Sequence, residues 1–276
     1  MTVWTESAAI KAARPAAQRL RPLRALAGRV LPGLLFCALL AGAWQYMASS
    51  WNSPLVPDLA AIGDELARIV TGGEAAVQIG VTLGRIVAGV LLAFVIAFAI
   101  AFASVRNRFA RAFFEPALLL GLTIPGLVWA LLCVIWFGLS WKTSVVAIGL
   151  GVAPALAINI VQGLEAVDPL LIEAAHVFRL KNGQRLRHLW LPAILPFLLA
   201  GVRLGFSLAW KVVVLVEVFG LSTGVGYELN SAFISQNVAG VLAWTVAFSV
   251  IVAAIEYGAF QAAERRLTRW KRRASV

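Results

Sequence analysis

Five charged residues interrupt the apolar runs of this chain, and their types and spacing could do chemistry. They are Arg85, Arg203, Lys211, Glu217 and Glu256. A charge at membrane depth is costly, so it usually faces protein or water and often marks a site that handles ions or polar solutes. We expect Arg85 and Glu256 near the outer ends of their runs, Arg203 toward the inner end of its run, and Lys211 close to the middle.

Three of these charges share one apolar run. At 3.6 residues per turn, Arg203 and Glu217 lie about 40° apart around a helix, and Arg203 and Lys211 about 80° apart. This spacing predicts a broad stripe that lines a pathway, with Ser207 and Trp210 as weaker members. A cationic stripe would suit an anionic solute. The alternative is a structural ion pair between Lys211 and an acid on another helix.

Residues for catalysis, metal binding or nucleotide binding do not cluster in the sequence. His176 and His188 lack neighbouring ligand residues, and Cys37 and Cys133 lie far apart in apolar runs, where a small buried side chain is the default. No G-x-x-x-x-G-K-[ST] motif is present to hold nucleotide phosphates. The sequence therefore predicts no catalytic, metal or cofactor site of its own, and ATP hydrolysis would have to come from a separate subunit.

The composition indicates a membrane protein. Of the 276 residues, 61% are hydrophobic and only 13% charged, too few polar residues to cover a soluble core of this size. A span needs ~20 apolar residues to cross a hydrocarbon core about 30 Å thick. The predicted fold class is an all-α integral membrane protein with six transmembrane helices, at about 31–51, 79–104, 114–138, 144–164, 194–220 and 239–262.

Charge clustering predicts how the spans are oriented. The net charge is +11, and most basic residues fall into four clusters, at 11–29, 106–111, 179–187 and 265–273. With six spans, all four clusters lie on one side, and basic loops are retained in the cytoplasm, so both termini are predicted to be cytoplasmic. This distribution argues against nucleic acid as a partner. The predicted domains are a basic tail at 1–30, the first span with an external connection at 31–78, a transmembrane core at 79–262 and a second basic tail at 263–276.

Two local patterns modify this outline. Pro125-Gly126 interrupts the third span and predicts a kink, which either borders the pathway or serves packing. The external connection from Asp58 to Thr71 has the pattern of a short amphipathic helix.

An amphipathic segment at 173–196 lies between two long apolar runs. Asp168-Pro169 supplies good helix-start chemistry, because Asp168 can cap free amides and Pro169 has no N–H to lose. A helix this short is unstable alone in water, so something must pack on its apolar face. That predicted face consists of Leu171, Ala174, Ala175 and Phe178.

The remainder of this segment predicts a helix–turn–helix. Asn182-Gly183 supplies a turn, and Gln184 to Leu191 is expected to form a second short helix. Pro192 and Pro196 then guide entry into the fifth span.

The run from Glu173-Ala174-Ala175 to Leu191-Pro192 resembles the EAA loop of the membrane subunits of type I ATP-binding-cassette importers. Trp136-Phe137-Gly138, Val167-Asp168-Pro169 and Ser222 to Tyr227 are similar to the nitrate, sulfonate and taurine permeases of that family, and the resemblance covers nearly the whole chain after residue 50. It implies that the loop is a cytoplasmic coupling helix between spans four and five, which docks on an ATPase. The residues it assigns to coupling are Glu173, Ala174, Ala175, Phe178, Arg179, Gly183, Leu191 and Pro192.

The resemblance also implies partners. They are ATPase subunits that bind ATP and Mg, an extracytoplasmic solute-binding protein, and a second permease copy in a homodimer. The location it implies is the lipid of a bacterial cytoplasmic membrane. The solute it implies is a small anion of the nitrate, sulfonate or taurine class.

One residue departs from the family pattern. Arg179 occupies the position where the family usually has a glycine, which readily takes the positive φ of a turn. Either Gly183 takes over the turn, or Arg179 stays helical and reaches an acidic patch on the ATPase; loss of coupling is the third reading.

Two alternatives compete with the anion permease. The same machinery could carry a thiamine-precursor pyrimidine, riboflavin or another small metabolite. From another class, an ion-coupled carrier should show internal repeats, and a membrane enzyme should show clustered His, Asp or Glu.

Overall fold

Helices make up all the regular structure in residues 14–51 and 53–262, the parts of the chain that the computed structural model describes. The chain divides into two units, residues 1–63 and 64–276. The second predicted basic tail, 263–276, lies outside the described residues, as do the first thirteen residues of the predicted tail 1–30.

The first unit contains α2 (Arg14–Trp51) and the start of α3 (Leu59–Thr71). The apolar segment Leu31–Trp51 of α2 is long enough to cross a membrane. The helix starts before this segment, so residues 14–30, predicted as a tail, continue directly into the span. Their many Ala, Leu and Arg residues are strong helix formers.

The predicted amphipathic helix at 58–71 is confirmed as α3. Asp58 starts it, because its Oδ1 accepts a hydrogen bond from the Ala61 N–H at 2.8 Å. The turn before it is tied to α2 by two bonds: Trp44 Nε1 donates to the Pro57 carbonyl at 2.9 Å, and the Leu59 N–H donates to Gln45 Oε1 at 3.0 Å.

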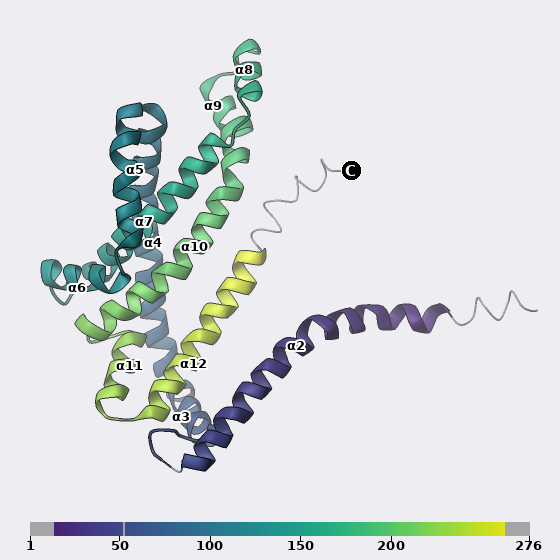
Figure 1. Cartoon of the computed structure of the whole chain (residues 1–276), viewed down its shortest axis with the longest axis vertical. Helices are drawn as coiled ribbons and strands as arrows, with labels where there is room; N and C mark the ends of the chain where they lie inside the picture. The colour runs from purple at the N-terminus through teal and green to yellow at the C-terminus, as the bar shows by residue number, and fades with distance from the viewer. Residues whose placement is uncertain (1–13, 52, 263–276) are drawn as a thin grey trace, which may run out of the picture. The chain divides into compact units, whose positions relative to one another are not determined.

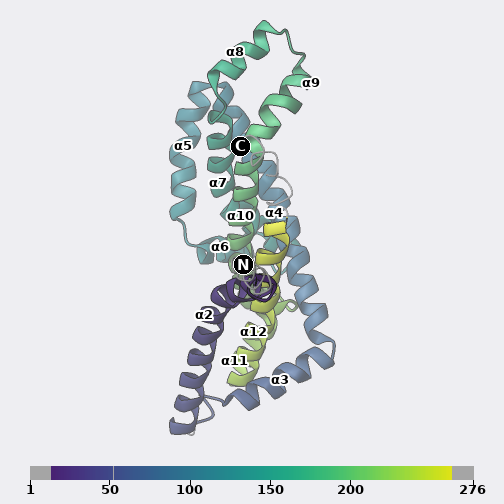
Figure 2. The same ribbon diagram turned by 90° about the vertical axis from the view of Figure 1, so that its right-hand side faces the viewer.

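The second unit is a bundle of long and short helices (Figures 1 and 2). Helices α8 and α9 lie at one end of the bundle and α11 at the other, and long helices run between the two ends. The elements that follow α3 are α4 (Glu74–Arg106), α5 (Arg108–Thr123), α6 (Gly126–Phe137), α7 (Trp141–Glu165), α8 (Pro169–Val177), α9 (Asn182–Arg185), the π-helix η1 (Leu186–Trp190), α10 (Leu191–Gly220), α11 (Val225–Ile234), α12 (Val238–Ala254) and the π-helix η2 (Ile255–Phe260).

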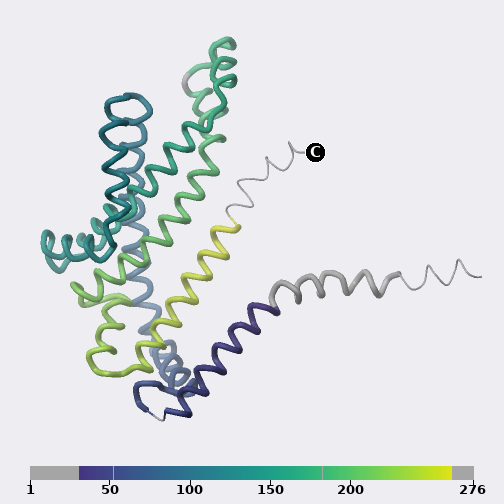
Figure 3. The backbone as a smooth tube through the Cα atoms, in the orientation of Figure 1, coloured from purple at the N-terminus to yellow at the C-terminus, as the bar shows by residue number. Residues whose placement is uncertain are grey.

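Five helices among the described residues are long and apolar enough to cross a membrane, or six if α5 and α6 form one bent span. The bend between α5 and α6 is 98°, much sharper than the predicted kink, and Figure 3 shows it as an abrupt turn of the tube. Ile124 leaves the helical conformation because a residue before proline avoids it, and Pro125 then begins α6.

The fifth span is longer than predicted. Gly183–Gly220 is one helical segment of 38 residues, so the second short helix expected at 184–191 is not a separate element. The π-turn explains the continuity. The Leu191 N–H bonds to the Leu186 carbonyl, five residues back, and this wider turn makes room for the ring of Pro192.

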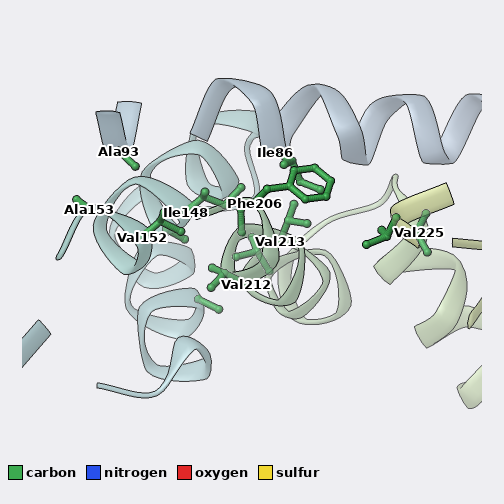
Figure 4. Close-up of a cluster of buried hydrophobic side chains, with 14 of the residues drawn as sticks. Ile86, Ala93, Ile148, Val152, Ala153, Phe206, Val212, Val213 and Val225 are labelled. Carbon is green, nitrogen blue, oxygen red and sulfur yellow. The ribbon is translucent and has the colours of Figure 1, made fainter. Parts of the chain in front are cut away.

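The core is built from small residues that let helices approach closely. On α4, residues 89, 93, 97 and 101 are Gly or Ala, are buried and recur every fourth position. A Cβ at Gly89 would lie 2.5 Å from Ile148 of α7, and one at Gly149 of α7 would lie 2.8 Å from Leu92. Such contacts are typical of helix packing in membranes. Figure 4 shows the branched side chains that fill the space around these contacts, among them Ile148 and Val213.

Candidate functional site

The start of α8 has the predicted cap. The Asp168 side chain accepts a hydrogen bond from the Leu170 N–H at 2.9 Å, and Pro169 occupies the first turn. Val167, just before the cap, is buried. The entry into the helix is therefore determined by local sequence.

The end of α8 contradicts both predictions for the turn, that Gly183 forms it and that Arg179 stays helical. Arg179 itself takes the left-handed conformation, with φ 48°, while Gly183 lies within a helix. The Leu180 N–H bonds to the Ala175 carbonyl and the Arg179 N–H to the His176 carbonyl, both at 3.0 Å. This is the Schellman motif of helix ends. The left-handed position of that motif is usually a glycine, and here it is Arg179.

The predicted apolar face of α8 is split between two environments. Ala175 is buried against its own chain and Ala174 is half-buried, whereas Leu171 and Phe178 are exposed, Phe178 by 77%. Glu173 and Arg179 are exposed as well.

The exposed face continues past α8. We call the exposed apolar residues at this end of the bundle the α8 patch: Leu170, Leu171, Val177, Phe178, Leu186 and Leu191. Of the other predicted coupling residues, Gly183 is exposed and Pro192 is half-buried in the first turn of α10. A group of exposed large apolar side chains at one end of the bundle is typical of an interaction site.

The predicted stripe on α10 is divided in the structure. At one level, the Glu256 carboxylate of η2 lies 3.7 Å from Arg203 Nε and accepts a hydrogen bond from Ser207 Oγ at 3.1 Å. The prediction that Glu256 lies at the outer level, with Arg85, is therefore wrong; it lies level with Arg203.

Lys211 and Trp210 lie further along α10. Trp210 is half-buried and packs edge-on against Phe248, while Lys211 is exposed, with its Nζ 5.7 Å from the Trp210 ring centre. None of the ion pairs found among the described residues includes Lys211, so the alternative of a Lys211–acid pair within the chain has no partner there.

Glu217 lies inside the bundle and not on an accessible stripe. Its side chain is fully buried and pairs with Arg85 of α4, whose Nη1 is 2.6 Å from Glu217 Oε1. Thr82 Oγ1 donates to the same carboxylate, and so does the Gly226 N–H, at 2.9 Å. In the single chain Glu217 thus lines no pathway.

This ion pair is the centre of a network that holds the connection between α10 and α11. Arg85 also donates to Thr223, from Nη1 to its carbonyl and from Nη2 to its hydroxyl, both at 2.7 Å. The Gly224 N–H bonds to Gln78 Oε1 at 2.7 Å and the Val225 N–H to Thr82 Oγ1 at 2.9 Å. The first amides of α11 are therefore capped by side chains of α4.

Gly224 and Gly226 let this connection approach the ion pair. Gly224 has φ 104°, and a Cβ there would lie 2.3 Å from the Glu217 carboxyl. A Cβ at Gly226 would lie 2.5 Å from the Val214 carbonyl oxygen. The glycines of the segment Ser222 to Tyr227 thus serve close packing.

Reasoning from one helix at a time missed the Arg85–Glu217 pair. Arg85 lies near the start of a span that runs away from the α11 end, and Glu217 lies near the end of a span that runs toward it. The directions of the two spans place both charges at the same depth, and this was a usable signal that the sequence analysis did not apply.

The sequence is similar to a family of transport proteins and to several of its members. Residues 89–269 match the family model described as "Binding-protein-dependent transport system inner membrane component". The chain is 28% identical over 243 residues to SsuC of Bacillus subtilis (strain 168), named for aliphatic sulfonates transport, covering 87% of this chain and 88% of that protein. It is 28% identical to the taurine transport system permease protein TauC of Escherichia coli (strain K12), covering 82% of this chain and 70% of TauC. It is 23% identical to the nitrate import permease protein NrtB of Synechococcus elongatus, covering 74% and 71%.

Solved structures share the fold. An inward-facing structure of the MetNI methionine ABC transporter aligns with a TM-score of 0.60 at 18% identity, covering 69% of this chain and 94% of that chain. An amino acid ABC transporter with histidines aligns with a TM-score of 0.54 at 20% identity, covering 75% and 97%. The family match spans about two thirds of the chain and includes the α8 patch and Glu217, whereas Arg85 lies just before the matched residues. The chain therefore belongs to the inner membrane components of binding-protein-dependent transport systems.

Proposed function

We propose that this chain is a permease that imports a small anion of the sulfonate, taurine or nitrate class, driven by a separate ATPase that docks on the α8 patch. The observation that carries the proposal is the exposed apolar surface of α8 and η1 at one end of the bundle, in a chain that belongs to this family. The relatives named above supply the solute class.

The length of the fifth span supports a docking role for this end. A helix of 38 residues is about 57 Å long, whereas a hydrocarbon core is about 30 Å thick. One end of it must extend well beyond the lipid. A push on the α8 end would pass along this helix to the opposite end, because α9, η1 and α10 form one unbroken segment.

The charges on α10 support an anionic solute. Lys211 is exposed in mid-span, where snorkelling to an interface is hardest, and Arg203 is only partly shielded by Glu256. In the proposed pathway, Arg203, Ser207, Trp210 and Lys211 face the solute, and a second copy of the chain completes the wall in a homodimer. Glu217 is left out of this role, since it is buried against Arg85.

The family's description, which names binding-protein-dependent transport, supports a solute-binding protein as a further partner. A binding protein on the outer side would deliver the solute, and both termini of the permease would be cytoplasmic, on the same side as the ATPase. Nucleotide and Mg would be bound by the ATPase and not by this chain. Nucleic acid has no role in this arrangement.

The coupling role is tested with Glu173→Ala and with a two-residue insertion between Ala175 and Gly183. Both changes should reduce ATP-driven uptake of taurine, ethanesulfonate or nitrate by about tenfold or more in proteoliposomes with the ATPase and binding protein, as expected when a charged contact is lost. Co-purification of the ATPase should fall in parallel. The helical circular dichroism signal should stay unchanged, because the spans do not depend on α8.

Glu115→Ala is the matched control, since Glu115 is also an exposed glutamate but lies on α5. It should retain wild-type uptake. Normal uptake by the Glu173 and insertion variants would rule out the coupling role of α8.

A further inference from the structure

A second polar surface lies at the α11 end of the bundle, far from the α8 patch. Here the turn between α6 and α7 faces the turn between α10 and α11 across a hollow of about 430 Å³. Arg85 lines it, together with the hydroxyl and amide side chains of Ser140, Ser222, Thr223 and Tyr227 and of Asn230. Its volume suits a small solute.

Arg85 has donors left over after the network is formed. Its Nη1 makes two bonds, to Glu217 and to Thr223, and its Nη2 makes one, to Thr223. Its Nε is buried and has no hydrogen-bond partner among the described residues. A guanidinium carries five N–H donors, so Arg85 retains two.

Of the two side chains in the ion pair, the positively charged one faces the hollow. Arg85 lines the hollow, whereas Glu217 does not and is fully buried behind it. Among the described residues, those that line the hollow include no carboxylate. An anion placed there would meet the cation of the pair before its counter-ion, in surroundings that screen the charge less than water does.

The other polar groups complete a set of donors. No side-chain bond is found within the described chain for Ser222, Tyr227 or Asn230, so their hydroxyl and amide groups are available to a ligand. Together with Arg85 they would satisfy several acceptor oxygens on one small group. This arrangement matches an oxyanion better than a cation or an apolar solute.

We propose that this hollow is an oxyanion subsite, which receives the sulfonate or a similar oxyanionic group of the solute at the end of the pathway opposite the ATPase. The assignment rests on the proposed function for the direction of solute movement. The binding chemistry itself belongs to Arg85, Tyr227 and Asn230. The subsite is separate from the charges of α10 at Arg203 and Lys211.

Direct binding to the purified chain tests the subsite without the ATPase. The probe is methanesulfonate, and its neutral isostere dimethyl sulfone is the control. Trp141 lines the hollow, so methanesulfonate should change tryptophan fluorescence in the wild type but not in Trp141→Phe, and dimethyl sulfone should have no effect. Equal responses to the two probes, or no response to either, would overturn the subsite.

Variants of the lining then connect binding to transport. Arg85 also holds the fold, so the test uses Tyr227→Phe with Asn230→Ala. This double variant should weaken methanesulfonate binding and raise the KM for sulfonate uptake, each by about tenfold. Ser235→Ala is the control, since Ser235 lies on the same stretch but bonds only to carbonyls of its own helix.

The outcomes separate the two proposals. Wild-type binding and a wild-type KM in the double variant would overturn the subsite and leave the permease function intact. Binding of methanesulfonate by a wild-type chain that supports no uptake would overturn the proposed function and leave the subsite intact.

Discussion

At the scale of single residues, the Arg85–Glu217 pair is the interaction for which the loss of one partner should cost the most free energy of folding. Both side chains are at least nine-tenths buried, so each charge relies on the other and on Thr82, Thr223 and the Gly226 amide for its solvation. Removal of one partner from a buried pair leaves an uncompensated charge, which costs about 3–5 kcal/mol. Removal of both leaves no such charge.

A double-mutant cycle tests this account. Arg85→Ala and Glu217→Ala should each lower the melting temperature in detergent strongly, and the combined variant should be much less destabilised than the sum of the two. Thermal unfolding followed by circular dichroism measures all four proteins. Strict additivity would mean that the two side chains do not interact across the bundle.

Arg179 shows a different kind of residue effect. A left-handed conformation costs a residue with a Cβ about 1–2 kcal/mol, and glycine avoids this cost. The chain accepts it because the Leu180 and Arg179 amides close the end of α8 onto the Ala175 and His176 carbonyls. The helix end is therefore imposed by hydrogen bonding, against the local preference of arginine.

At the scale of elements, α11 is held between α4 and the segments on either side of it. The Gln78 side chain of α4 makes two hydrogen bonds at this contact. Its amide nitrogen donates to Glu228 Oε1 at 2.9 Å, and its oxygen accepts from the Gly224 N–H. Burial raises the pKa of Glu228, and the nearby Glu74 carboxylate raises it further. The Gln78 hydrogen bond and the charge of Arg68 act in the opposite direction.

The pH dependence of stability follows from the direction of this shift. Because the pKa of Glu228 is raised by folding, the stability it contributes is fully present below its unfolded pKa of about 4.5 and is lost as the pH rises through the folded pKa. Glu228→Gln keeps an oxygen for Gln78 without the charge. It should raise the melting temperature at pH 7 and leave it nearly unchanged at pH 4, in thermal scans at both values. An equal shift at both pH values would show that charge is not the cause.

At the scale of the whole molecule, the single chain leaves polar and apolar surfaces that lipid alone does not suit. Lys211 is exposed on α10, nine residues before the end of this helix at Gly220, and the described residues offer it only the Trp210 ring. An ammonium group at this depth must meet water or protein. In the proposed assembly, a water-filled pathway between two copies meets this need.

Labelling of Lys211→Cys, in a chain that lacks Cys37 and Cys133, tests this placement. In the assembled transporter it should react with a water-soluble maleimide that does not enter lipid. Ser235→Cys, exposed beyond the spans, is the positive control, and Val213→Cys, fully buried, is the negative control. Failure of Lys211→Cys to react while Ser235→Cys does would place α10's charge against lipid or protein and remove it from the pathway.

Much of the architecture could be read from the chain itself. Apolar run length predicted the spans, and Asp58 and Asp168 predicted where α3 and α8 begin. These features depend on residues within a few positions of one another, or on the thickness of a bilayer. The lipid and the helical backbone therefore determine them without reference to any particular neighbour.

Tertiary structure alone decided which charges meet. Glu217 pairs with Arg85, 132 residues away, and Glu256 lies against Arg203 and Ser207. Angular spacing on one helix says which residues share a face, but it does not say which helix packs on that face or at what height. Close contacts at glycines, Gly89 of α4 against Ile148 of α7 and Gly205 of α10 against Val152 of α7, fix the relative heights of α4 and α10 and so bring Arg85 level with Glu217.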